Sequence, residues 1–140
     1  MTLKDELAND PLGIGYAGMT NAEIEVSLNT KNRTRLVTTM IGFGKILDAL
    51  GPTDGASVLD TLEQIKATNS ALKWAWYLLE RGELDVALAS TRGQIDVLAS
   101  AGAMTTDQAA AIKALAETPC SRAEELGVVA LDFDIMHARA

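Results

Sequence analysis

A glycine-rich segment at residues 13–18 is the first place in this sequence where residue spacing suggests chemistry. It matches the pattern G-x-G-x-x-G, whose backbone amides approach a pyrophosphate when the segment lies between a strand and a helix. A predicted helix and Pro11 precede the segment here, so the strand that the motif requires is missing. We therefore expect no nucleotide site, and we expect residues 12–19 to form an ordered apolar arm.

Two residue types capable of catalysis occur once each in the chain, as Cys120 and His137. Cys120 follows Pro119 just before a predicted helix, whose dipole would lower the thiol pKa, but no histidine base lies near it in sequence. His137 lies three residues from the end of the given chain, where fixed partners for catalysis or metal binding are scarce. We expect a partly buried Cys120, a surface His137 and no catalytic residue. A single cysteine also excludes an internal disulfide and a thiolate metal site.

Three carboxylates form an acidic corner at Glu80, Glu83 and Asp85. Such a group offers oxygen ligands to Ca²⁺, but its spacing differs from that of an EF-hand loop. We interpret these residues as solvated and helix-capping, and we expect neither a metal nor a cofactor.

The charge balance is acidic, with 12 Lys and Arg against 19 Asp and Glu and a net charge of −7. An acidic surface repels phosphate backbones, which makes nucleic acids and anionic membranes poor candidate partners. The basic residues cluster once, at Lys31, Arg33 and Arg35, without an aromatic side chain to stack a base. We interpret that cluster as a solvated linker.

Targeting signals are not apparent in this sequence. Residues 1–9 carry charges where a signal peptide needs an apolar stretch, and no run approaches the roughly 18 apolar residues of a membrane span. We expect a protein that is made and retained in a reducing cytoplasm, or that is assembled there into something larger.

Composition favours helices. Hydrophobic residues make up 48 % of the chain but aromatic residues only 4 %, so the core must consist of Ala, Leu, Ile, Val and Met. We predict an all-α fold, a compact bundle of about six to eight short helices with an extended N-terminal apolar arm. Residues 1–140 are predicted to form one domain, with the arm and short helices in 1–38 and the helical core in 39–140.

Helix boundaries are marked by caps and stop signals. Predicted N-caps are Thr2, Thr20 with Glu23, Thr105 with Gln108, and Ser121 with Glu124. Proline ends helices at residues 10–11, 51–52 and 118–119.

Three glycines leave alternatives open. Gly42 and Gly44 lie in a helical pattern over residues 40–50, so they either permit close helix packing or show that the helix begins later. Residues 84–89 and 95–101 form either two helices or one helix that is strained at Gly93.

The aromatic group Trp74, Trp76 and Tyr77 indicates an interface. Neighbours one or two residues apart on a helix point in different directions, so at least one of these side chains should reach the surface or a partner. We select Trp76 as that residue.

The two ends of the chain resemble a family of short proteins encoded by tailed bacteriophages. The matching segments are residues 3–13 (LKDELANDPLG), 15–20 (GYAGMT), 27–29 (SLN), 121–127 (SRAEELG) and 138–139 (AR). Members of this family are encoded near virion structural genes, and most carry no assigned function. The family usually has an arginine where Ile14 stands. The resemblance implies a phage protein associated with the virion.

We therefore predict a virion-associated structural or adaptor protein of the tail or head-tail module, which is not an enzyme and has no small-molecule substrate. It would be assembled in the host cytoplasm and contact other phage structural proteins, with self-association left open. The predicted interface residues are Leu12, Ile14, Tyr16, Met19 and Trp76. The alternative is a non-virion phage regulator whose acidic surface binds and inhibits a host protein.

Overall fold

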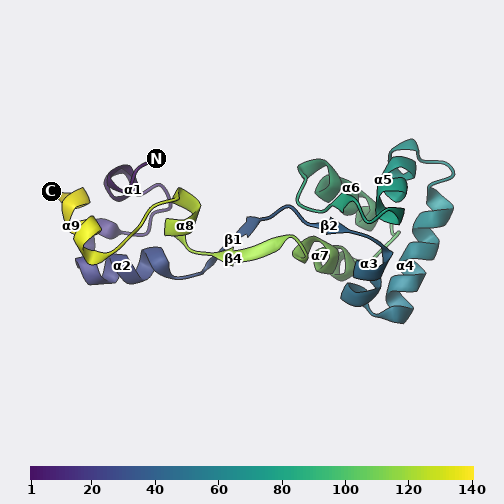
Figure 1. The fold of residues 1–140 in the computed structure, drawn as a ribbon, viewed down its shortest axis with the longest axis horizontal. Coiled ribbons are helices and arrows are strands. Elements are labelled where there is room, and N and C mark those ends of the chain that lie inside the picture. The colour runs from purple at the N-terminus through teal and green to yellow at the C-terminus, as the bar shows by residue number, and fades with distance from the viewer. The chain divides into compact units, whose positions relative to one another are not determined.

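The computed structural model describes residues 1–140 and is mainly helical (Figure 1). It contains nine α-helices, one 3-10 helix and two short two-stranded sheets. The prediction of a mainly helical chain is confirmed, whereas the prediction of a purely all-α chain is wrong. The polar connection at residues 31–38 holds strand β1 (Arg33–Leu36), which pairs with β4 (Glu117–Cys120).

Two compact units make up the chain. Unit 1 consists of residues 1–35 and 118–140, and unit 2 consists of residues 36–117. The C-terminal residues therefore belong with the N-terminal ones, and not with a core over 39–140 as the sequence suggested. Two compact units can still unfold as one domain, so the single-domain interpretation stays a prediction.

Unit 1 joins helices from the two ends of the chain. Its elements are α1 (Leu3–Asn9), the 3-10 helix η1 (Tyr16–Gly18), α2 (Asn21–Asn29), α8 (Arg122–Leu126) and α9 (Asp132–Arg139). Helix α9 packs against both α1 and α2, and α8 packs against α2. The buried core consists of Tyr16, Ile24, Leu28, Ala123, Ala130 and Ile135.

Predicted N-caps begin several of these helices. Thr2 and Asp5 form a complete capping box, in which each side chain binds the other residue's backbone N–H. Thr20 and Ser121 accept the backbone N–H groups of residues 23 and 124 at the starts of α2 and α8. In unit 2, Thr105 and Gln108 form a second complete box. These caps satisfy N–H groups that the first helical turn leaves without a partner.

The predicted apolar arm is folded into unit 1. Residues 16–18 form the turn η1, and the Tyr16 side chain is only 1 % exposed. Ile14 and Met19 pack against the same core, while Leu12 stays exposed. The extended arm is thus a wrong prediction, because burying a large aromatic ring stabilises the compact turn.

Unit 2 is mainly helical and contains one small sheet. Its elements are β2 (Met40–Ile41), α3 (Phe43–Leu50), α4 (Pro52–Ile65), α5 (Ser70–Glu80), β3 (Leu84–Asp85), α6 (Ala89–Ser100) and α7 (Thr106–Ala114). Strands β2 and β3 are antiparallel, with Ile41 opposite Leu84. The core is aliphatic apart from Trp76, which is 8 % exposed and lies beside Phe43 with ring centroids 5.0 Å apart.

The structure decides between the alternatives that Gly42, Gly44 and Gly93 left open. Helix α3 begins at Phe43, later than the periodicity suggested, and Gly42 lies so close to Gly82 that an added Cβ would be 3.1 Å from its Cα. Helix α6 runs unbroken through Gly93, which leaves one helix instead of two. The predicted helix at residues 84–89 is wrong, because β3 pairs there with β2.

Candidate functional site

A buried charged cluster joins the two ends of the chain in unit 1. Glu6 on α1 is fully buried, and the Arg122 guanidinium at the start of α8 donates two hydrogen bonds to it. Arg122 Nε lies 2.8 Å from Glu6 Oε1, and Nη2 lies 2.8 Å from Oε2. The Tyr16 hydroxyl donates a third bond to Oε1, at 3.0 Å. Two parallel charge-assisted bonds of this kind are the strongest form of the ion pair.

The ionisation of the cluster follows from these contacts. The hydrogen bonds from Arg122 lower the pKa of Glu6, against the opposing effect of burial. Burial raises the pKa of Tyr16, and its hydrogen bond to Glu6 raises it further. The Glu6 carboxylate is therefore charged and the Tyr16 phenol neutral at pH 7. Because each group is hydrogen-bonded within the cluster, we assign the cluster a structural role and no catalytic role.

The G-x-G-x-x-G segment already holds an anion, which is the side chain of Asp10. Asp10 Oδ1 accepts the N–H of Ile14 at 2.8 Å, and Oδ2 accepts that of Gly15 at 2.7 Å. Asp10 itself has a left-handed backbone with φ of 41°. The amides that would bind a phosphate in a nucleotide fold are thus bound to the chain's own carboxylate.

The charged groups noted in the sequence are separated or paired. In the acidic corner, Asp85 is buried and its Oδ1 accepts the backbone N–H groups of Thr39 and Ala87, each at 3.0 Å. Glu83 pairs with Arg81, and Glu80 is exposed. The corner therefore does not act as one cluster.

The basic run is neutralised in part within unit 1. Lys31 pairs with Glu124 at 3.5 Å, and Arg33 pairs with Glu125. The prediction of a solvated linker is corrected in part, because two of its three cations face carboxylates on α8.

The single cysteine and the single histidine do not form a catalytic or metal-binding group. Cys120 is fully buried, more so than predicted, and His137 is exposed beside Phe133, with ring centroids 4.3 Å apart. No group of three or more His, Cys, Asp or Glu side chains is placed to hold a metal ion. No helix has both the length and the apolar character needed to cross a bilayer.

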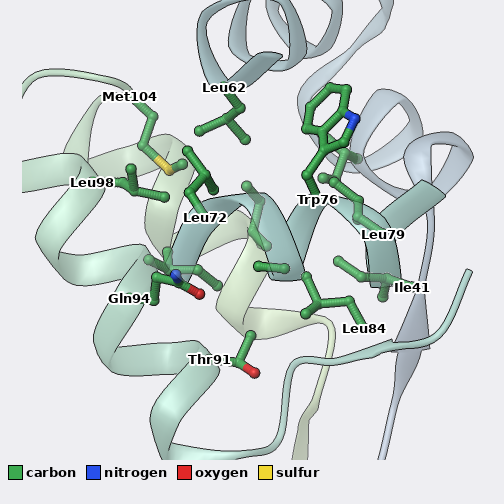
Figure 2. A pocket seen from close by; sticks show the side chains of 14 residues that line it. Ile41, Leu62, Leu72, Trp76, Leu79, Leu84, Thr91, Gln94, Leu98 and Met104 are labelled. Carbon is green, nitrogen blue, oxygen red and sulfur yellow. The ribbon is translucent and has the colours of Figure 1, made fainter. Parts of the chain in front are cut away.

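Unit 2 contains a small apolar cavity (Figure 2). Its volume is about 40 Å³, and Leu62, Leu72, Leu98 and Met104 point into it from four different segments. Ligand pockets usually measure about 300–1,000 Å³, so this cavity has no room for a substrate. It is a packing defect in an aliphatic core.

The five predicted interface residues differ in how far they are buried. Tyr16 and Trp76 are core residues and present no surface to a partner, which corrects their selection. Ile14 and Met19 are half-buried, and Leu12 is exposed. The sequence argument that one aromatic near Trp76 must reach the surface is confirmed by Trp74, whose side chain is 63 % exposed.

Each unit carries an exposed apolar surface. In unit 2, Trp74, Tyr77 and Leu78 form the α5 surface, beside a groove of about 550 Å³ that Leu88 and Val97 of the α6 region also line. No charged residue lines this groove.

In unit 1, Phe133 and Met136 are exposed on helix α9 and form the α9 surface, and Leu131 just before the helix is exposed as well. Sequence reasoning did not single out these residues, although Phe133 and Met136 are three apart and Ile135 between them is buried. That spacing was the available signal, because residues i and i+3 share one face of a helix.

Comparisons of this chain with protein-family models, with curated proteins and with solved structures find no match.

Proposed function

We propose that this chain is an adaptor that binds other proteins through two surfaces, one on each compact unit. The observation that carries the proposal is the presence of the α5 surface in unit 2 and the α9 surface in unit 1. Contiguous exposed apolar side chains are costly in water and mark binding sites for other proteins. Two such surfaces on separate units suit a protein that connects two partners.

The partners we propose are structural proteins of a phage particle, in the tail or the head-tail module. The resemblance to tailed-phage proteins supports this part of the proposal. All of its matching segments fall within residues 1–35 and 118–140, the range of unit 1. Under this proposal unit 1 carries the attachment to the particle, and the α9 surface makes that contact.

Purified particles from the phage that encodes this chain provide the test. Mass spectrometry should detect the chain in a constant ratio to known structural proteins. Replacing Phe133 and Met136 with serine should reduce that ratio at least about tenfold, because aromatic and methionine side chains are common anchors of interfaces. Val26→Ser changes an equally exposed apolar residue on α2 and should leave the ratio unchanged.

A different result would support the alternative function. If the chain is absent from particles and affinity capture from infected cells recovers one host protein, the chain is a regulator. Its net charge of −7 would then suit a basic partner.

A further inference from the structure

Another pocket of unit 2 lies between helices α3 and α4, and we call it the α3–α4 pocket. Its volume is about 310 Å³, at the lower end of the range of ligand sites. Phe43 and Leu47 line it from α3, Leu59 lines it from α4, and the buried Trp76 of α5 lines it as well. Phe43, Leu47 and Leu59 are half-buried, so they leave an apolar floor that is open to one side.

Two carboxylates, Asp60 and Glu63, also line this pocket and form its rim. They are exposed and lie three residues apart, which places them beside each other on one face of α4. None of the ion pairs of the structure includes either of them. Both charges are therefore available to a cation from another molecule.

The lysines nearest in sequence to the pocket do not neutralise this rim. Lys66 lies one turn after Glu63, but it makes no ion pair, and its Nζ lies 4.9 Å from the centroid of the Trp76 ring. Lys45 is two residues from Leu47, so at 100° per residue it points to the far side of α3. One cation beside two carboxylates leaves the rim negative.

We infer that the α3–α4 pocket binds an arginine side chain of a partner protein. The aliphatic part of that side chain lies on the apolar floor, and its guanidinium faces Asp60 and Glu63. Charge complementarity selects this occupant. An anionic side chain is repelled by the rim, and a purely apolar one leaves both carboxylates without a partner.

A planar guanidinium suits this pocket better than the ammonium of lysine. It donates from a fixed fork and can reach two neighbouring carboxylates, and its flat face packs on an aromatic ring. Phe43 supplies such a ring at the open side of the pocket, beside Trp76. Lys66 shows that a cation already packs against this aromatic pair.

This inference goes beyond the proposed function, because it adds a third site and names the chemical group that fills it. The pocket lies wholly in unit 2, apart from the α9 surface that the particle test addresses. A binding test on the purified full-length protein needs no phage particle. Its failure would overturn the arginine site and leave the proposed function unaffected.

Blocked amino acids serve as probes in an NMR titration of the labelled full-length protein at constant ionic strength. Acetyl-arginine amide should shift the methyl signals of Leu47 and Leu59 with a dissociation constant of about 1–10 mM, the range for one side chain. Acetyl-citrulline amide has the same shape without the charge and should bind at least about tenfold more weakly. Equal binding of the two probes, or no saturable shift up to about 100 mM, would overturn the inference.

Charge variants test the rim. Asp60→Asn and Glu63→Gln should each weaken binding of the arginine probe about threefold, the effect of one exposed ion pair. Lys66→Gln should strengthen it about twofold, because it removes the competing cation. Asp54→Asn is the matched control, since it removes the same charge at least 120° around α4 from both rim residues and should leave binding unchanged. Equal weakening by the control would mean that the probe responds only to the acidic surface as a whole.

Two more probes test the identity of the occupant. Acetyl-lysine amide should bind at least about threefold more weakly than the arginine probe, because its ammonium is more strongly hydrated and cannot stack. Free arginine carries its own carboxylate toward the negative rim and should also bind more weakly. Tighter binding of free arginine would make the pocket a site for a small molecule and would exclude a protein side chain as its occupant.

Discussion

Arg122 is bonded to Glu6 across 116 residues of sequence, through two hydrogen bonds of 2.8 Å each. The pair joins α1, near the start of the chain, to α8, near its end. The carboxylate is fully buried and also accepts the Tyr16 hydroxyl. The integrity of unit 1 therefore depends on a charge that would be costly to leave without its partner.

Arg122→Ala should destabilise unit 1 by about 3–5 kcal/mol, because it leaves the Glu6 carboxylate buried and unpaired. Both tryptophans lie in unit 2, so tryptophan fluorescence reports on that unit, whereas circular dichroism reports on all helices. In urea, the variant should lose part of its circular dichroism before its tryptophan signal changes. Replacing both Glu6 and Arg122 with leucine should recover much of the loss. Coincident, wild-type-like transitions in the Arg122→Ala protein would contradict the prediction.

The stability of unit 1 should fall at acidic pH. Hydrogen bonds from Arg122 hold the pKa of Glu6 below its usual value of 4.5, while the unfolded chain keeps a pKa near that value. The unfolded state thus binds protons first, and the stabilisation is present above about pH 4.5 and lost as pH falls through the lowered pKa.

Urea titrations of unit 1 between pH 7 and pH 3 measure this dependence. Glu6→Gln removes the titrating group, so its stability should change less with pH than that of the wild type. The pKa of Asp5 is also lowered, chiefly by the Thr2 backbone hydrogen bond, but Asp5 is present in both proteins and cancels in the comparison. Parallel pH profiles would show that Glu6 is not the responsible group.

Asp10 should be required for the order of the glycine-rich segment. Asp10→Ala leaves two backbone N–H groups without an acceptor and places alanine in a left-handed conformation, so we expect a loss of about 2–3 kcal/mol. Asp10→Asn keeps one acceptor oxygen and tolerates the backbone, and should cost about 1 kcal/mol. Hydrogen exchange at the amides of Ile14 and Gly15 should be faster in Asp10→Asn than in the wild type, and fastest in Asp10→Ala. Unchanged exchange in the alanine variant would exclude this role.

Two helix glycines should respond in opposite directions to alanine. An added Cβ at Gly55 in α4 would lie 2.9 Å from the Leu47 Cα, whereas one at Gly93 in α6 meets no atom within 4 Å. Alanine gains helix propensity at both sites, so Gly93→Ala should stabilise by about 0.5–1 kcal/mol. Gly55→Ala should destabilise by about 1–3 kcal/mol, because α3 and α4 must move apart. Thermal denaturation of both variants measures the difference, and similar melting temperatures would contradict close α3–α4 packing.

Local signals were sufficient for many of the helices. Thr2 and Thr105 begin helices as predicted, because an N-cap acts on the backbone within three residues of itself. The divergence of Trp74 from Trp76 also followed from helix geometry alone, but the choice between them did not. Only packing shows that Trp76 lies beside Phe43 and that Trp74 remains exposed.

The sequence by itself determined where several helices begin, the aliphatic nature of the core and the acidity of the surface, since each depends on neighbouring residues or on composition. The tertiary structure alone decided that Glu6 meets Arg122, that Asp10 occupies the glycine-rich segment and that residues 118–140 return to the first unit. The physical reason is that the free energy of such contacts depends on the whole packed arrangement, and a pattern along the chain does not contain that arrangement.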